Sequence, residues 1–186
     1  MSKKIKIGDC AKSTHGDPIV CVGFASGRAV WGNPLEFMDL YHIEESTAEF
    51  LPTLHLPIGN DPKKYGGCWF DLIRSGVKKE EYREFFGMDK GSPINIKTLV
   101  DWQKEDWQWL IRSFVERSEF MYDQISFKPW KVLHLTNGYG HERPQLWAHI
   151  ENISIGRGNP EWGAPKDRDV FIIRLGAIFH TKNLKV

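Results

Sequence analysis

The sequence predicts an α+β domain built on a small β-barrel, with flanking helices and a short N-terminal β extension. Short apolar runs bounded by Gly, Pro, Asn and Asp recur along the chain, which is typical of strands. Two segments, 69–75 and 98–123, instead repeat apolar residues with helical spacing. The chain has 186 residues and is 41% apolar, which suffices for one buried core and excludes global disorder.

Residues 1–50 are predicted to form the extension and to pack on the main domain. A brief alternation at 4–7 suggests a short strand, and the runs at 19–24 and 29–31 around a Ser-Gly turn indicate a hairpin. The acidic segment 35–49 fits a loop or a short helix. Because about fifty residues bury little apolar surface by themselves, we expect this extension to depend on the rest of the chain.

The main domain, residues 51–186, is predicted to alternate strands with one early and one long helix. Phe70 and Ile73 share a helical face, and Gly76 follows at the position where a helix commonly ends. A mostly apolar run near the C-terminus fits a buried strand. The expected elements are a strand at 54–58, a helix at 69–75, a strand at 77–86, a helix at 98–123, and strands at 131–135, 145–155 and 170–178.

The helix predicted at 98–123 is an insertion that is rich in tryptophan. Trp102 and Trp109 are seven residues apart and share a helical face, whereas Trp107 points elsewhere. Three interpretations of this helix remain open: an element that packs into the core, a platform on which nucleobases stack, and a contact face for a protein partner.

The composition excludes several classes of protein. The net charge is +1, so the chain as a whole is not attracted to nucleic acid, although residues 128–186 carry an excess of Lys and Arg. No apolar run approaches the roughly 18 residues of a membrane helix, and the N-terminus lacks the apolar stretch of a secretion signal. We therefore expect a cytoplasmic protein without a membrane partner. The oligomeric state is left open.

No cofactor or metal site is predicted. Cys10, Cys21 and Cys68 are odd in number and contain no close pair, which argues against a disulfide framework and against a zinc knuckle. Three histidines of the C-terminal third have spacings that match no metal-binding pattern: His134, His141 and His149.

The most informative segment contains the pattern G-x-K-x-x-E-x-R, formed by Gly76, Lys78, Glu81 and Arg83. In a strand, Glu81 and Arg83 point to the same side and offer a hydrogen-bond acceptor beside a bidentate donor. Lys78, just after the glycine turn, can reach the same cleft. This set suits a ligand with amide and phosphate groups. The alternative is an exposed strand whose ion pairs each contribute well under about 1 kcal/mol.

This pattern, between a helix and a strand, resembles the signature of the ASCH domain, a branch of the PUA-like superfamily. The resemblance covers about residues 54–180, and the tryptophan-rich insertion departs from it. It implies a PUA-like β-barrel that binds RNA or a modified nucleotide in the cleft beside Lys78, Glu81 and Arg83, with Tyr82 between the last two. It also implies that Asn137, Tyr139 and Trp162 lie where the cleft opens. Tyr139 or Trp162 can stack on a base there, or serve only for turn and lid packing.

The same resemblance implies a second possibility, which is an enzyme. Some ASCH proteins hydrolyse the acetyl amide of N4-acetylcytidine with the motif lysine and a threonine, and others are linked to ribonuclease activity. The lysine is present as Lys78, but Glu81 stands in place of the threonine. If the chain is an amidohydrolase or a ribonuclease, we expect Lys78 and Glu81 to be catalytic, and a lysine serves as a base or nucleophile only in its neutral form.

Overall fold

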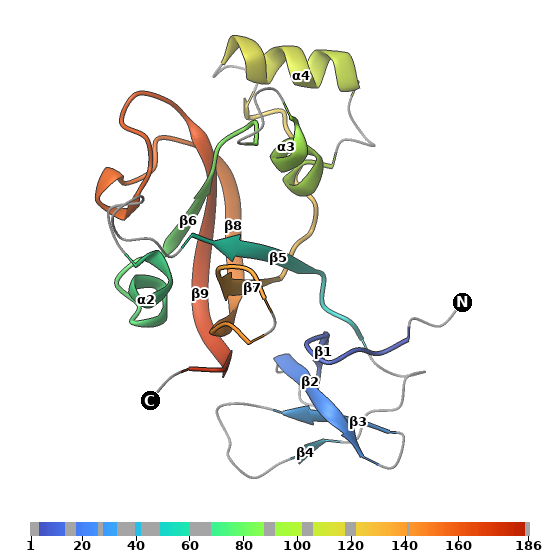
Figure 1. Ribbon diagram of the computed structural model, residues 1–186. Helices are drawn as coiled ribbons and strands as arrows, with labels where there is room; N and C mark the ends of the chain where they lie inside the picture. Colours follow the sequence, from blue (N-terminus) through green and yellow to red (C-terminus); the bar gives the residue numbers. More distant parts are fainter. Residues whose placement is uncertain are drawn as a thin grey trace.

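The computed structural model shows an α+β fold that consists mainly of two sheets (Figure 1). It describes residues 4–13, 18–25, 28–32, 40–41, 49–59, 68–87, 92–101, 106–117, 122–140 and 142–184. Within them, no helix is long and apolar enough to cross a membrane. The elements are β1 (Cys10–Lys12), β2 (Pro18–Ala25), β3 (Arg28–Gly32), β4 (Leu40–Tyr41), β5 (Thr53–Ile58), α2 (Trp69–Arg74), β6 (Glu80–Arg83), α3 (Ile94–Leu99), α4 (Trp107–Glu116), β7 (Val132–Asn137), β8 (Gln145–Gly156), the 3-10 turn η1 (Pro160–Trp162) and β9 (Val170–Lys182).

The N-terminal sheet has the strand order β1-β2-β3-β4 and contains the expected hairpin as the antiparallel pair β2–β3. The strand expected at 4–7 is wrong. The Asp9 amide donates to the carbonyl of Lys6, and the Asp9 carboxylate accepts from the Lys6 amide, so the chain turns there. Of the acidic segment 35–49, only residues 40–41 and 49 are described. Residues 40–41 form β4, so the loop or short helix expected there is wrong at these two positions, and residues 35–39 and 42–48 lie outside the described residues.

Successive residues of the N-terminal sheet contribute to two different apolar clusters, as the alternation of a strand requires. Ile19 and Cys21 pack with Trp31 in the core of this sheet. Cys10 and Val20 pack in a separate cluster with residues of the larger sheet, namely Val132, Trp147 and Phe179. The N-terminal sheet therefore buries one face against the larger sheet.

The larger sheet has five strands in the order β5-β7-β8-β9-β6. β5 and β7 are parallel, and the other neighbouring pairs are antiparallel. The two edge strands approach each other, because the Arg83 side chain on β6 donates to the Pro57 carbonyl on β5 over 2.9 Å. No backbone ladder joins these two edges in the described part of the chain. The sheet is therefore curled, while a fully closed barrel stays a prediction.

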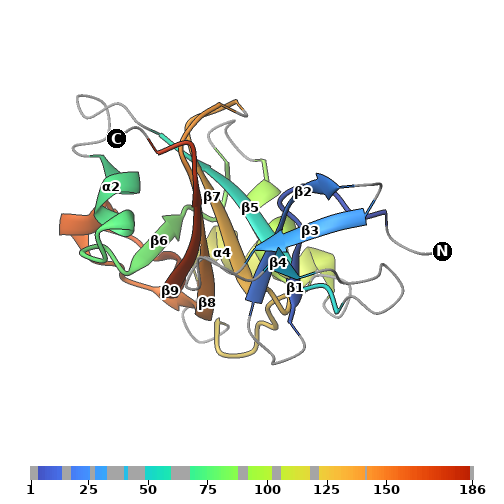
Figure 2. The same cartoon turned by 90° about the horizontal axis from the view of Figure 1, so that it is seen from below.

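The helix, glycine and strand around the sequence motif are confirmed. α2 ends at Arg74, two residues before Gly76, and β6 follows at 80–83, within the strand expected at 77–86. Phe70 and Ile73 are buried in the main core, as their helical spacing predicts. Seen from below, α2 and the N-terminal sheet lie on opposite sides of the five-stranded sheet (Figure 2).

The single helix expected at 98–123 is wrong. α3 ends at Leu99, and Val100 has an extended backbone that forms an antiparallel bridge with Phe127. A helix cannot continue through a residue whose backbone pairs with a distant segment, so the chain contains two shorter helices, α3 and α4. The break depends on a contact with Phe127, which lies beyond the predicted helix.

The start of α4 is set by Asp106, whose carboxylate accepts a hydrogen bond from the Trp109 amide at 2.8 Å. This is an ordinary N-cap. Trp109 packs against the main core, which supports the core-packing interpretation for that residue. The face expected to join Trp109 with Trp102 cannot be described, because Trp102 and the Trp107 side chain lie outside the described part.

Candidate functional site

The turn between α2 and β6 places the functional side chains. Ser75 caps the helix, and Gly76 has a φ of 76°, a left-handed conformation that favours glycine. The Lys78 amide then donates to the Leu72 carbonyl at 2.9 Å, which folds the chain back against the helix. Lys78 is thereby fixed at the entrance to β6.

The buried Lys78 and Glu81 and the half-buried Arg83 form one ion-paired group, which we call the motif cluster. Lys78 Nζ lies 2.9 Å from Glu81 Oε2, and Arg83 Nη2 lies 3.2 Å from Glu81 Oε1. The exposed fractions of the three side chains are 3%, 5% and 23%. The prediction that Glu81 and Arg83 share a side is confirmed. An exposed strand with weak surface ion pairs is excluded, because the Lys78 and Glu81 side chains are buried, and a buried charge is costly unless it is paired.

Aromatic rings complete the surroundings of the Lys78 ammonium. Its nitrogen lies 5.0 Å from the ring centre of Trp69 and 5.2 Å from that of Tyr82. Both distances suit a cation–π interaction. Lys78 is therefore held by a carboxylate and two ring faces. Trp69 is not among the predicted site residues, because nothing in the spacing of residues 69–78 shows that the indole turns toward the lysine.

Tyr82 points to the opposite side of β6 from Glu81 and binds the loop between β8 and β9. Its hydroxyl donates to Glu80 Oε2 at 2.7 Å and accepts from the Asn159 amide at 3.0 Å. Burial, and then the hydrogen bond to Glu80, raise the pKa of Tyr82. A Cβ atom at Gly158 would lie 2.6 Å from the Tyr82 ring, so this loop approaches the ring more closely than any side chain allows.

The same loop also contacts Trp69. A Cβ atom at Gly163 would lie 2.9 Å from the indole, so there is no room for a side chain. Gly163 also has a φ of 93°, a left-handed backbone conformation that favours glycine. Gly158 and Gly163 together let the loop cover the two rings that flank Lys78. The sequence marks these glycines only as loop residues, because their partners are more than seventy positions away.

Asn137 lies near the motif cluster through β5. It is the last residue of β7, is 7% exposed, and pairs in register with Ile58. The neighbouring carbonyl, that of Pro57, accepts the Arg83 hydrogen bond. Arg83 Nε and Asn137 Oδ1 are both buried without a hydrogen-bond partner among the described residues. One is a donor and the other an acceptor, and they adjoin consecutive residues of β5.

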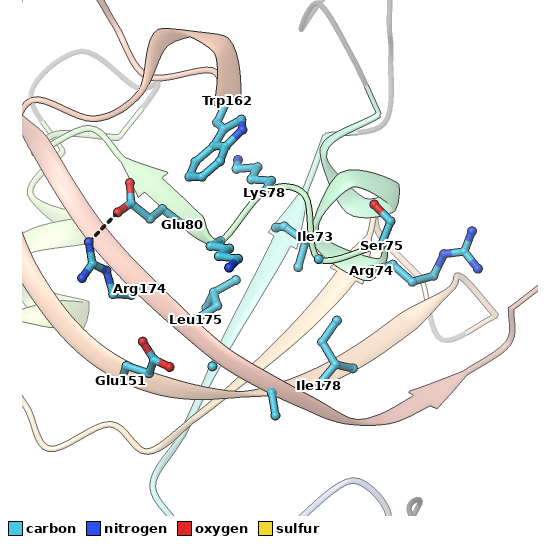
Figure 3. A pocket seen from close by; sticks show the side chains of 14 residues that line it. Ile73, Arg74, Ser75, Lys78, Glu80, Glu151, Trp162, Arg174, Leu175 and Ile178 are labelled. Carbon is cyan, nitrogen blue, oxygen red and sulfur yellow. Dashed lines mark hydrogen bonds and ion pairs between the residues drawn. The ribbon is translucent and has the colours of Figure 1, made fainter.

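A pocket of about 660 Å³ opens beside the motif cluster, between the end of α2 and the middle of β9 (Figure 3). Lys78 is one of the lining residues, so it belongs to both the motif cluster and the pocket. Trp162, on η1, lies at its rim close to Lys78 in this view. Tyr139 is elsewhere, 85% exposed in the turn after β7, and is not part of the pocket lining.

A second polar group on the five-stranded sheet was not predicted. His134 Nδ1 lies 2.8 Å from His55 Nδ1, and His134 Nε2 lies 2.9 Å from Gln145 Oε1. The His134 ring stacks on Trp147 with 4.0 Å between ring centres, and His180 packs on the same indole. Burial lowers the pKa of His134 to about 4 and also lowers the pKa of His180. We call these five residues the histidine network.

No group of three or more His, Cys, Asp or Glu suited to a metal ion occurs in the described residues. Of the other histidines considered from the sequence, His149 packs on Phe179, and His141 lies outside the described residues. Cys10, Cys21 and Cys68 form no disulfide with one another.

Comparisons with known proteins do not place the chain in a family. No protein-family model, curated protein or solved structure matches it. A function must therefore be argued from the motif cluster, Asn137 and the adjoining pocket.

Proposed function

We propose that this chain is a PUA-like domain of the ASCH type that binds RNA or a modified nucleotide by holding one base against the motif cluster. The single observation that carries the proposal is the unpartnered pair of buried atoms, Arg83 Nε and Asn137 Oδ1. The strand order and the side-chain bridge from Arg83 to Pro57 support a barrel-like domain.

A base edge supplies what these two atoms lack. A buried polar atom without a partner costs about 1–3 kcal/mol, so a ligand that satisfies both gains affinity. Glu81 is occupied by Lys78 on one oxygen and by Arg83 on the other. Arg83 Nε therefore remains as a donor, and Asn137 Oδ1 as an acceptor. A cytosine-type base matches them, because its amino group donates while its ring nitrogen and carbonyl accept.

Hydrolysis is less favoured by this geometry. A base or nucleophile must come within hydrogen-bond distance of the reacting atom. The Lys78 nitrogen is instead engaged by a carboxylate and two ring faces, and Glu81 is held between two cations. The cluster thus acts as a positioned set of charges that orients a ligand.

The proposal is tested by titrating the protein with cytidine, N4-acetylcytidine and a short single-stranded RNA while heat release is measured. We expect Arg83→Ala to lower the affinity for every ligand that the wild type binds by about tenfold or more. Asn137→Leu should lower affinity similarly. It should also raise the free energy of unfolding by about 1 kcal/mol, because it removes an unsatisfied buried acceptor.

Arg112→Ala is the matched control, because Arg112 is an exposed arginine on α4, and within the described residues its ion pair is with Glu116. It should leave binding unchanged. Equal affinities for the wild type, the Arg83 variant and the Asn137 variant would show that the ligand binds elsewhere. A large loss of stability in Asn137→Leu would show that Asn137 is a structural residue.

A further inference from the structure

The pocket beside the motif cluster is larger than a single base requires and contains groups that the cluster does not use. Ligand sites of about 300–1,000 Å³ bury most of a drug-sized molecule, and this pocket has about 660 Å³. The proposed base partners, Arg83 and Asn137, are not among its lining residues. If the base is held by those two residues, the pocket is available for another part of the ligand.

The pocket combines an apolar floor with an aromatic rim. Ile73 from α2, together with Leu175 and Ile178 from β9, contributes the apolar surface. Trp162 at the rim is half-buried, so part of its indole is open to a ligand (Figure 3). A planar ring that stacks on an aromatic side chain gains about 1–3 kcal/mol with little dependence on base identity.

Some charged side chains of the pocket already have a hydrogen-bond or ion-pair partner, which we call committed, and others, which we call uncommitted, have none among the described residues. Glu80 accepts from Tyr82 and pairs with Arg174 at 3.3 Å. Lys79 and Glu151 line the pocket, and neither side chain forms a hydrogen bond or ion pair within the described part of the chain. The uncommitted cation suits a phosphate, and the uncommitted carboxylate suits a hydroxyl or amino donor. A ribonucleotide carries all of these groups.

We propose that this pocket binds the nucleotide next to the one held by the motif cluster, so that the ligand is an RNA of at least two nucleotides. The neighbouring base stacks on Trp162, and the linking phosphate lies at Lys79. This inference rests on the proposed function, and it selects RNA over a free modified nucleotide. Lys78 belongs to the motif cluster and also lines the pocket, so it connects the two subsites.

The experiment compares cytidine with the dinucleotide cytidylyl-cytidine in calorimetric titrations at two salt concentrations. The wild type should bind the dinucleotide at least about tenfold more tightly than cytidine, as one added stacking interaction predicts. Lys79→Gln should remove much of that gain and weaken the salt dependence, while leaving cytidine binding unchanged. Trp162→Leu should also reduce the gain, and Lys131→Gln, outside the pocket, should change neither affinity.

The outcomes separate the two proposals. If the wild type binds cytidine but gains nothing from the second nucleotide, the pocket proposal is wrong and the proposed function stands. If the gain is present but survives in Lys79→Gln and Trp162→Leu alike, the second nucleotide binds outside the pocket and the proposal is again wrong. If the wild type binds neither ligand, both proposals are overturned.

Discussion

The two buried polar groups of the five-stranded sheet tolerate burial in opposite ways. The motif cluster keeps its charges and pairs them, with one carboxylate between a lysine and an arginine. In the histidine network the His134 ring is uncharged, because burial lowers its pKa to about 4 and so keeps it neutral at physiological pH. Burying a charge is costly unless it is paired, whereas a neutral imidazole needs only hydrogen-bond partners.

This difference separates the roles of the two groups. The motif cluster contains a buried donor without a hydrogen-bond partner among the described residues, on Arg83, and its Lys78 lines a pocket, which is why we propose it as the ligand site. His134 has partners on both ring nitrogens and an indole against its face, which suits a structural role. Trp147, the stacking partner, also belongs to the apolar cluster that joins the two sheets. Ligand binding should thus depend on the first group, and the packing of the N-terminal sheet on the second.

Glu81→Gln should have the largest effect, because it removes the negative charge that both cations share. Gln preserves the shape of the side chain but leaves the buried Lys78 and the half-buried Arg83 close to each other without a counter-charge. Removing one member of a buried ion pair costs about 3–5 kcal/mol. Denaturation by urea measures the loss in the free energy of unfolding.

Glu151→Gln is the matched control for that measurement. Glu151 is exposed, with no ion pair recorded in the structure, and its replacement should change the free energy of unfolding by no more than about 0.5 kcal/mol. Equal effects of the two substitutions would mean that the motif cluster is hydrated and not a buried ion-pair group.

The local layout of the motif cluster was predictable from the sequence, whereas the histidine network was not. Gly76 ends a helix, and the spacing of Glu81 and Arg83 puts them on one side of a strand, so both inferences need only neighbouring residues. The contact between His55 and His134 instead depends on the parallel register of β5 and β7, which joins residues 79 positions apart. A long-range pairing of the same kind ended the predicted helix at Val100.

Acidification should have the second-largest effect and should act through the histidine network. His134 has a pKa of about 4 in the folded protein, against an ordinary value of 6.5. Between these values the unfolded chain binds a proton that the folded chain does not, so stability falls as the pH is lowered from 6.5 to 4. A shift of this size corresponds to about 3 kcal/mol at most. The lowered pKa of His180 acts in the same direction.

His134→Phe isolates this contribution, because the phenyl ring can still stack on Trp147 but cannot take up a proton. Urea denaturation at several pH values should give a shallower decrease in stability for this variant than for the wild type. Identical slopes between pH 6.5 and 4 would show that His134 titrates as an ordinary histidine, and the contrast between the two polar groups would then be lost.

His55→Ala should have the smallest effect and tests how the neutral state of His134 is maintained. Since Gln145 Oε1 can only accept, His134 Nε2 carries the proton, and His134 Nδ1 must accept from His55. Losing this hydrogen bond should lower the free energy of unfolding by about 1 kcal/mol. It should also raise the pKa of His134, because the bond favours the neutral ring and a charged His55 repels a second charge. Nuclear magnetic resonance titration of the His134 ring protons measures the midpoint, which should move upward from about pH 4. An unchanged midpoint would mean that burial alone keeps the ring neutral, and that the hydrogen bond from His55 contributes nothing to that state.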